Sequence, residues 1–306
     1  MKIVALAGGV GAAKFLSGLV RVIPPENLTI IVNTGDDFRW QGLHISPDLD
    51  TITYTLAGLS NPETGWGIRG DTFHCLSRLK ALGCDTWFQV GDRDLATHVY
   101  RTDRLRVGIG LSEVTDCIRK MNGIEARVLP MTDSFVPTQV HTDEGTMHLQ
   151  DYFVRRKCEP RVSGFTFQGI EASKPAPGVL ESLGDASAVI VCPSNPFISI
   201  NPILAVPGVR ASLRHPTVIA VSPIIAGRAI KGPTAAMLAQ MGHEVSAVSV
   251  AEMYRDFVDT FVLDHQDAAL QNRITTLGMK ARIADTLIDN DEARIALARS
   301  VLEMVG

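Results

Sequence analysis

The sequence has few cysteines, and none of them forms a closely spaced pair. There are five, an odd number, and no two occur as Cys-x-x-Cys, which argues against a disulfide framework and against a structural zinc site. The amino terminus has one lysine and then a short apolar stretch broken by glycines, without the small-residue cleavage site that ends a secretory signal. These absences predict a protein of the reduced cytoplasm.

Long apolar runs and a large excess of one charge are also missing. No stretch approaches the ~20 apolar residues of a membrane-spanning helix, so no membrane partner is expected. The net charge is -4 at pH 7, spread without blocks of like charge, whereas a nucleic-acid-binding protein usually carries a basic patch. An acidic ligand would therefore need backbone N–H groups, a few basic side chains or a divalent cation.

Motifs of covalent catalysis are absent as well. The chain contains neither the Gly-x-Ser-x-Gly of the serine hydrolases nor the His-Glu-x-x-His of the zinc proteases. Positioning of substrates together with a divalent cation is the chemistry that remains, and phosphoryl groups are usually transferred in this way.

What the sequence does have is a regular alternation of buried strands and helices. Its 306 residues are 45% hydrophobic and 20% charged, enough apolar material for a large core. Runs that are apolar at every residue are typical of parallel strands buried on both faces. We predict strands at 3–7, 28–33, 188–192, 217–222, 244–248 and 260–263, and helices at 12–22 and 285–305.

This alternation changes between residues 67 and 174, where helical segments and polar, hairpin-like segments follow one another. We therefore predict an α/β fold with a Rossmann-like, doubly wound, mostly parallel sheet. Residues 1–66 and 175–306 would form the nucleotide-binding core. Residues 67–174 would form an inserted helical and β subdomain that covers the active site.

The chain opens with MKIVALAGGVGAAKF, in which an apolar strand runs directly into Gly8, Gly9 and Gly11. Glycines at a strand-to-helix turn let a phosphate approach the backbone, and the start of the helix supplies unpaired N–H donors. The spacing differs from that of a P-loop, and Lys14 stands where the dinucleotide fingerprint has its third glycine. An anion site is the natural interpretation, and a tight turn without a ligand is the alternative.

Acidic side chains follow the second strand. VNTGDD places Asn33, Asp36 and Asp37 at the sheet edge where doubly wound proteins bind ligands. SPDLDT adds Asp48 and Asp50, whose carboxylates would point the same way in an extended segment. Mg²⁺ prefers one or two carboxylates with phosphate oxygens and water, so the acids predict a magnesium site. Capping of a turn or helix is the alternative for each acid singly.

Three further polar segments would reach the same edge. GDRDLATH contains Arg93, which can bind a phosphate bidentately, with a solvated helix start as the alternative. CPSNP carries Ser194 and Asn195, whose side chains offer neutral hydrogen bonds to a phosphate or a base. SPIIAGRAIKGP adds Arg228 and Lys231 as candidate phosphate ligands. For the last two segments, a rigid turn is the alternative.

Taken in order, LAGGVGAAKFL, VNTGDD, ISPDLDTITYTLAG, GDRDLATHVYRT, PSNPFISINPILAVPGVR and SPIIAGRAIKGP resemble the 2-phospho-L-lactate transferase family of coenzyme F420 biosynthesis. The resemblance extends from Lys2 to about Asp259. It implies transfer of a phospholactyl or phosphoenolpyruvyl group from a guanosine diphosphate adduct, which is derived from GTP. The acceptor would be the ribityl hydroxyl of the deazaflavin Fo (7,8-didemethyl-8-hydroxy-5-deazariboflavin), and GMP would be released. The family also implies a need for Mg²⁺, a Rossmann-like core with an inserted subdomain, and a homodimer.

The resemblance further implies roles for individual residues. Asp50 would position or deprotonate the acceptor hydroxyl at the junction of deazaflavin and metal, and Asp36 and Asp37 would be the other metal ligands. Archaeal relatives often have a basic residue near the deazaflavin where this chain has Gln89, so Arg93 is the expected catalytic cation. The residues expected to bind the nucleotide or the deazaflavin are Gly8, Gly9, Gly11, Asn33, Gln89, Ser194 and Asn195.

Two other functions fit part of the pattern. A non-catalytic regulatory protein that binds nucleotide sugars, from the related superfamily with a similar glycine-rich opening, is the chief alternative. An NAD(P) oxidoreductase is disfavoured by Lys14 and by VNTGDD, which stands where a ribose-binding acid should follow the second strand. The residues do not distinguish among phospholactate, phosphoenolpyruvate and a phosphoglycerate as the transferred acid.

Overall fold

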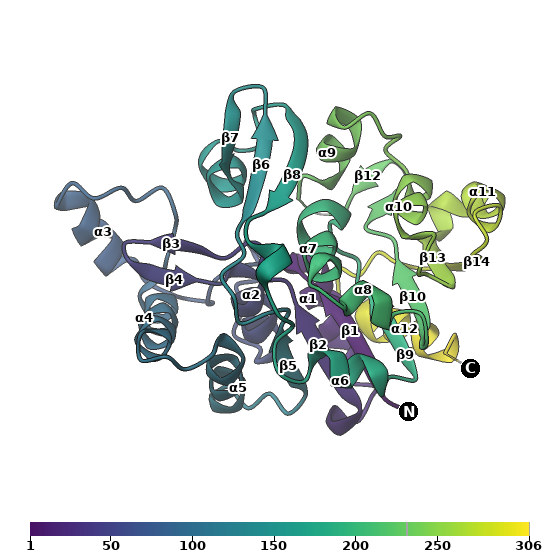
Figure 1. The fold of residues 1–306 in the computed structure, drawn as a ribbon, viewed down its shortest axis with the longest axis horizontal. Coiled ribbons are helices and arrows are strands. Elements are labelled where there is room, and N and C mark those ends of the chain that lie inside the picture. Colours follow the sequence, from purple (N-terminus) through teal and green to yellow (C-terminus); the bar gives the residue numbers. More distant parts are fainter. Residues whose placement is uncertain (231, 306) are drawn as a thin grey trace.

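A seven-stranded sheet forms the centre of the molecule (Figure 1) in the computed structural model, which describes residues 1–230 and 232–305. In chain order its strands are β1 (Ile3–Ala7), β2 (Leu28–Val32), β5 (Arg127–Pro130), β9 (Ala188–Val191), β10 (Thr217–Val221), β13 (Thr260–Asp264) and β14 (Lys280–Ala284). Their spatial order is β14-β13-β10-β9-β1-β2-β5, and all neighbours pair in parallel. The predicted α/β, doubly wound class is confirmed.

Successive residues of each strand point to opposite faces of the sheet, so two apolar layers form. Ile3 and Ala5 of β1 pack in one layer and Leu6 in the other. The first layer contains residues of α1 (Gly9–Leu19), α2 (Pro47–Leu56), α5 (Leu111–Met121) and α12 (Asp291–Glu303). The second contains residues of α6 (Val179–Gly184), α7 (Asn201–Ala205), α8 (Val209–Ser212), α9 (Thr234–Gln240), α10 (Ala247–Tyr254) and α11 (Gln271–Thr275).

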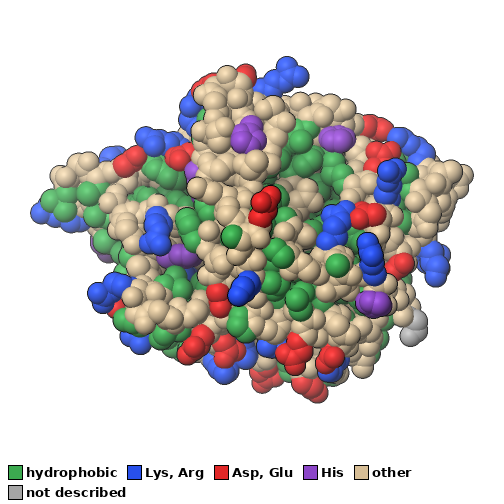
Figure 2. Space-filling view, in the orientation of Figure 1, with side chains coloured by type: hydrophobic (Ala, Val, Ile, Leu, Met, Phe, Trp, Pro, Cys, Tyr) green, Lys and Arg blue, Asp and Glu red, His purple; other side chains and the backbone are tan. Residues whose placement is uncertain are grey.

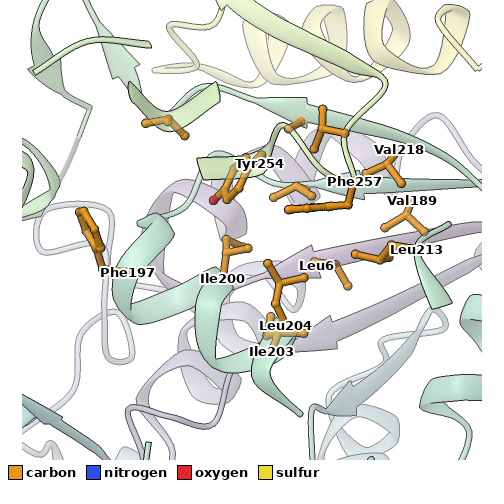
Figure 3. Packing of buried hydrophobic residues seen from close by; sticks show 14 of the residues in the cluster. Leu6, Val189, Phe197, Ile200, Ile203, Leu204, Leu213, Val218, Tyr254 and Phe257 are labelled. Carbon is orange, nitrogen blue, oxygen red and sulfur yellow. The ribbon is translucent and has the colours of Figure 1, made fainter. Parts of the chain in front are cut away.

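Figure 3 shows the second layer from close by. Leu6 of the sheet lies near Leu204, and Val189 lies near Leu213 and toward the ring of Phe257. All of these side chains are buried. This packing fixes the strands whose carboxyl ends carry the polar loops described below.

Helix α1 packs tightly against α12 where Gly18 meets the backbone of Arg294. A Cβ at position 18 would overlap the carbonyl group of Arg294. Although alanine is the better helix former, we expect Gly18→Ala to destabilise the protein by about 1–3 kcal/mol, because only a backbone shift could relieve the overlap. Thermal unfolding measures this effect.

Gly184→Ala is the matched control for that variant, since a Cβ at the last residue of α6 would have no neighbour within 4 Å among the described residues. Equal unfolding temperatures for the two variants would show that the approach of α1 to α12 does not depend on glycine.

The remaining elements surround the carboxyl edge of the sheet. The hairpin β3 (Phe38–Trp40) and β4 (Leu43–Ile45) extends to one side with α3 (His74–Ala81) and α4 (Asp92–Arg106), and a three-stranded antiparallel sheet rises beside them (Figure 1). That sheet consists of β6 (Thr138–Thr142), β7 (Gly145–His148) and β8 (Val162–Phe167), and a small ribbon is formed by β11 (Ile224–Ile225) and β12 (Arg228–Ala229). Short helical turns occur at Pro25–Asn27, Asp151–Arg155, Ile170–Ala172, Pro196–Ile200 and His265–Leu270.

The segment 67–174 contributes to both parts of the fold. It supplies α3, α4, α5 and the three-stranded sheet, but it also supplies β5, which pairs with β2 at the edge of the central sheet. The chain thus returns to the core once within this segment. The proposed domain boundaries stay a prediction.

One strand prediction is wrong, and two strands of the central sheet were not predicted. The predicted strand at 244–248 is wrong, because helix α10 begins there with Ser246 as its N-cap. The Ser246 hydroxyl accepts a hydrogen bond from the Ser249 N–H. A short apolar run does not distinguish a buried helix from a strand. Strands β5 and β14 were not predicted, because these edge strands carry exposed charged residues such as Arg127 and Lys280.

Neither the surface charges nor the cysteines point to a particular partner or cross-link. On the face shown in Figure 2, Lys and Arg side chains intermix with Asp and Glu rather than gathering in one patch. The five cysteines are all free thiols. In the part of the chain that the structure describes, none of the helices has both the length and the hydropathy needed to cross a membrane.

Candidate active site

A cavity of about 440 Å³ opens at the carboxyl ends of β1, β2, β9 and β10. Strands β1 and β9 are neighbours whose following segments continue in opposite directions along the sheet, so the cavity lies at the switch point where doubly wound folds bind ligands. Its wall brings together much of the predicted site: Gly8, Gly9, Gly11, Asp36, Asp48, Asp50, Gln89, Ser194 and Asn195. Three aromatic residues from outside the central sheet also line it: Trp66, Phe88 and Phe153.

The glycine turn between β1 and α1 is closely packed. Gly9 N–H donates to Asp48 Oδ1 at 2.8 Å, and a Cβ at Gly8 would lie 2.7 Å from both Asp48 Oδ2 and Ser199 Cβ. A Cβ at Gly11 would overlap the carbonyl oxygen of Pro193. Glycine is therefore needed here for close approach to α2 and to the loop after β9.

The Ser194–Asn195 loop is partly committed to its own structure. The Asn195 side-chain oxygen accepts hydrogen bonds from Phe197 N–H and Ile198 N–H, at 2.9 and 3.4 Å, and so caps the following helical turn. Ser194 Oγ lies 3.4 Å from the Gly8 nitrogen. Both residues line the cavity, with Ser194 the one whose side chain faces the glycine turn.

Asn33, Asp36 and Asp48 form a buried polar cluster. We call its two carboxylates, Asp36 and Asp48, the acidic pair. Asn33 Nδ2 lies 2.8 Å from Asp36 Oδ1, 2.8 Å from Asp48 Oδ2 and 3.1 Å from the Ile198 carbonyl oxygen. An amide group has only two protons, so the three acceptors outnumber what Asn33 can donate. A cation or an additional proton would satisfy the excess.

The pKa values of the acidic pair are displaced in the direction that this crowding requires. Burial raises the pKa of Asp48 to about 7, against the hydrogen bonds that Asn33 and Gly9 donate. Burial also raises the pKa of Asp36 well above its ordinary range, and the charge of Asp48 adds to the effect. Near neutral pH the pair therefore holds a proton or binds a cation.

This raised pKa predicts how the stability of the metal-free protein depends on pH. The unfolded value for Asp is about 3.9, so the folded state binds the proton of Asp48 more tightly, and this contribution to stability is lost as pH rises through about 7. We expect Asp48→Asn to remove part of the fall in unfolding temperature between pH 5 and pH 8.

Thermal unfolding without added metal measures this, and adding Mg²⁺ at pH 8 should restore stability to the wild type. If wild type and variant showed the same pH dependence, Asp48 would not be the group that titrates.

Asp37 points away from Asp36, although the two are consecutive. Its Oδ2 accepts a hydrogen bond from Ser46 Oγ at 2.8 Å and lies 2.8 Å from His44 Nε2. Burial raises the pKa of Asp37, and the contacts with His44 and Ser46 partly offset that rise. Its side chain binds the β3–β4 hairpin and is not part of the described cavity wall.

The expectation that Asp48 and Asp50 share one side of an extended segment was wrong. Both lie in the first turn of α2, whose first residue is Pro47, and residues two apart in a helix face different directions. Asp48 contacts Gly9, while Asp50 binds Arg101. Ser46 followed by Pro47 was the available sign of a helix start.

Helix α4 supplies the partners of Asp50. Arg101 is buried and donates hydrogen bonds to both carboxylate oxygens of Asp50, through Nη1 at 3.0 Å and through Nη2. Arg101 Nη1 lies 3.2 Å from His98 Nδ1, and Tyr54 Oη donates to Asp94 Oδ1 at 2.7 Å. Sequence reasoning missed Arg101, and its spacing from Asp94 and His98 was the available signal.

Arg93 lies on another side of the same helix. It is exposed and is not one of the residues that line the cavity, and its N–H donates to Asp71 at the start of α4. Gln89 does line the cavity. Arg228 is exposed and away from the cavity wall, and Lys231 lies outside the described residues.

Two acidic groups therefore face the cavity, and they differ in charge balance. Asp50, Asp94 and His98 place one potential ligand atom each within 4.8 Å of one another, but Arg101 already supplies a positive charge there. The acidic pair has only amide and N–H donors. Among the described lining residues there are four aspartates and neither lysine nor arginine, so a bound cation would offset the repulsion between these carboxylates and an anionic ligand.

Known proteins resemble this chain over nearly its whole length. The family model for 2-phospho-L-lactate transferase CofD matches residues 3–301. The 2-phospho-L-lactate transferase of Methanosarcina mazei is 40% identical over 297 residues, 97% of this chain and 98% of that protein. The phosphoenolpyruvate transferase of Streptomyces griseus is 40% identical over 314 residues, 99% of this chain and 98% of that protein.

One solved structure supports the fold alone. A member of the upf0052 family from Bacillus halodurans has a TM-score of 0.66 at 14% identity, and the match covers 99% of this chain and 100% of that one.

The family match over nearly the whole chain also confirms the resemblance inferred from the motifs. The chain therefore belongs to the 2-phospho-L-lactate transferase CofD family of enzymes.

Proposed function

We propose that this protein is a Mg²⁺-dependent transferase of coenzyme F420 biosynthesis. It would move a phospholactyl or phosphoenolpyruvyl group from a guanosine diphosphate adduct to the ribityl hydroxyl of the deazaflavin Fo, with release of GMP. The observation that carries the proposal is the cavity wall: four aspartates, with neither lysine nor arginine among its described residues, beside a glycine turn. A divalent cation held by these carboxylates would offset the repulsion between them and a diphosphate.

The donor would lie against the glycine turn. Gly8, Gly9 and Gly11 line the cavity at the start of α1, and the first turn of α1 carries no acidic residue. Its N–H groups beyond Gly9 would bind the diphosphate, helped by the partial positive charge of the helix start. Ser194 would add a hydroxyl donor, while Asn195 would hold the loop in shape.

The acidic pair fits a magnesium ion. Asp36 and Asp48 are buried and face more acceptors than donors, and two carboxylates with phosphate oxygens and water suit Mg²⁺. The ion would neutralise the diphosphate and stabilise the departing GMP. Of the other expected ligands, Asp37 is bound to His44 and Ser46 and Asp50 to Arg101, so we favour Asp36 with Asp48.

The acceptor would lie against the aromatic side chains of the cavity wall. Trp66, Phe88 and Phe153 line the cavity, and aromatic side chains suit a flat ring system. Trp66 and Phe153 are 44% and 39% exposed, so their rings are accessible to the flat ring of a deazaflavin. Asp50 would then accept a hydrogen bond from the ribityl hydroxyl and hold it in line with the phosphoryl group.

The direct test is incubation of purified protein with Fo, Mg²⁺ and each candidate guanylyl donor, followed by mass spectrometry of the products. We expect a transferred three-carbon acid on Fo and one GMP for each product, with the preferred donor identifying the acid. Binding of the nucleotide without product, and unchanged Fo fluorescence, would instead favour the regulatory alternative. A homodimer and a cytoplasmic location stay predictions, and sedimentation tests the former.

A further inference from the structure

Helix α4 buries charged side chains where an amphipathic helix usually buries apolar ones. Its buried residues are Asp94, His98 and Arg101. These positions are four and three residues apart, so they lie on one face of the helix. The face packs against α2, from which Asp50 and Tyr54 contribute the opposing polar groups.

The contacts within this polar face are specific in direction. Arg101 binds both oxygens of the Asp50 carboxylate, and a guanidinium that binds in this forked way also fixes the plane of the carboxylate. Arg101 Nη1 is 3.2 Å from His98 Nδ1. Because arginine can only donate, Nδ1 must accept, which leaves the imidazole proton on Nε2. His98 Nε2 lies 3.4 Å from Asp94 Oδ1.

Stability alone does not account for such a face. Replacing a buried ion pair by apolar side chains of similar volume is often neutral or stabilising, because the charges lose their hydration. The acidic and basic side chains lie at different depths. The cavity is lined by Asp50, Asp94 and Tyr54. Arg101 and His98 do not line it and are each 2% exposed. The two basic side chains therefore stand behind the two acids.

We propose that Arg101 and His98 are positioning residues, which fix the orientation of the Asp50 and Asp94 carboxylates toward the acceptor side of the cavity. The inference rests on the proposed function, because it assigns Asp50 to the acceptor hydroxyl. It also gives α4, which belongs to the segment 67–174, a role in the reaction: the helix holds Asp50 in position from behind the cavity wall. A misplacement of about 1 Å at a reacting group can lower the rate about 100-fold.

The test is a double-mutant cycle of Asp50→Asn and Arg101→Met, with kcat and the KM for each substrate measured. We expect Arg101→Met to lower kcat by about 100-fold with little change in the KM of the guanylyl donor. In the Asp50→Asn background the same replacement should have almost no further effect, since Arg101 acts through Asp50. Independent, additive losses would overturn the proposal.

Further variants separate positioning from folding. Arg101→Lys keeps the charge but loses the fork, so it should recover part of kcat while unfolding like the wild type. Arg106→Met is the matched control, because Arg106 is on the same helix with its side chain 77% exposed, and its kcat should be unchanged. If Arg101→Met and Arg106→Met had equal kcat, Arg101 would have no positioning role.

Nitrogen NMR of the His98 imidazole gives a readout that does not require activity. We expect the proton on Nε2 in the wild type and a changed Nδ1 chemical shift in Arg101→Met, because Nδ1 then lacks its donor. A proton on Nδ1 in the wild type, or an unchanged Nδ1 shift in the variant, would overturn the assigned contact. Failure of the wild type to transfer any group would instead refute the proposed function. The NMR result would then still test the contact between Arg101 and His98.

Discussion

Asp36→Asn should nearly abolish Mg²⁺-dependent transfer, with kcat at least about 1000-fold below that of the wild type. The carboxylate of Asp36 shares the Asn33 amide with Asp48, and the variant leaves a single carboxylate to hold the ion. A bound metal contributes several kcal/mol to charge stabilisation in the transition state, and about 4 kcal/mol corresponds to this factor.

Two measurements check the prediction. Turnover should be titrated with Mg²⁺, and binding of Mn²⁺ should be measured by calorimetry without substrate. Asp185→Asn is the control, because Asp185 pairs with Lys2 on the surface and its side chain is 57% exposed. Wild-type metal affinity in Asp36→Asn would remove Asp36 from the site.

Gly11→Ala should weaken binding of GDP by about 100-fold. A Cβ at this position would overlap the carbonyl oxygen of Pro193, so either the start of α1 or the loop that carries Ser194 must move. Loss of two hydrogen bonds to a charged diphosphate, at about 1.5 kcal/mol each, corresponds to that factor.

Calorimetric titration with GDP and Mg²⁺ measures the affinity. Gly184→Ala again serves as the control, since its added methyl group has room. If Gly11→Ala bound GDP as tightly as the wild type, the diphosphate could not lie against this turn. A variant that had merely unfolded would be recognised by its thermal transition before the titration.

Much of the central sheet could be predicted from the sequence because its inner strands are buried on both faces. Strands such as Ile3–Ala7 and Leu28–Val32 are apolar at nearly every residue, a pattern that few other structures produce. Edge strands are covered less completely, so Arg127 and Lys280 interrupt their patterns. Residues 244–248 were misassigned since their apolar run suits a helix equally well.

The candidate site was predictable where it depends on sheet topology. Gly8, Asp36 and Ser194 each follow a strand of one parallel sheet, so their convergence follows from the fold. The network behind the cavity was not predictable in the same way. Arg101 meets Asp50 from 51 positions away, and only the packing of α4 on α2 brings them together.

The most direct test is a crystal structure with GDP and Mn²⁺, with the metal located by its anomalous scattering. We predict one metal peak between Asp36 and Asp48, bonded to the diphosphate, with the phosphates against the Gly8–Gly11 turn. A metal bound instead by Asp50, Asp94 and His98, or GDP bound outside this cavity, would contradict the account.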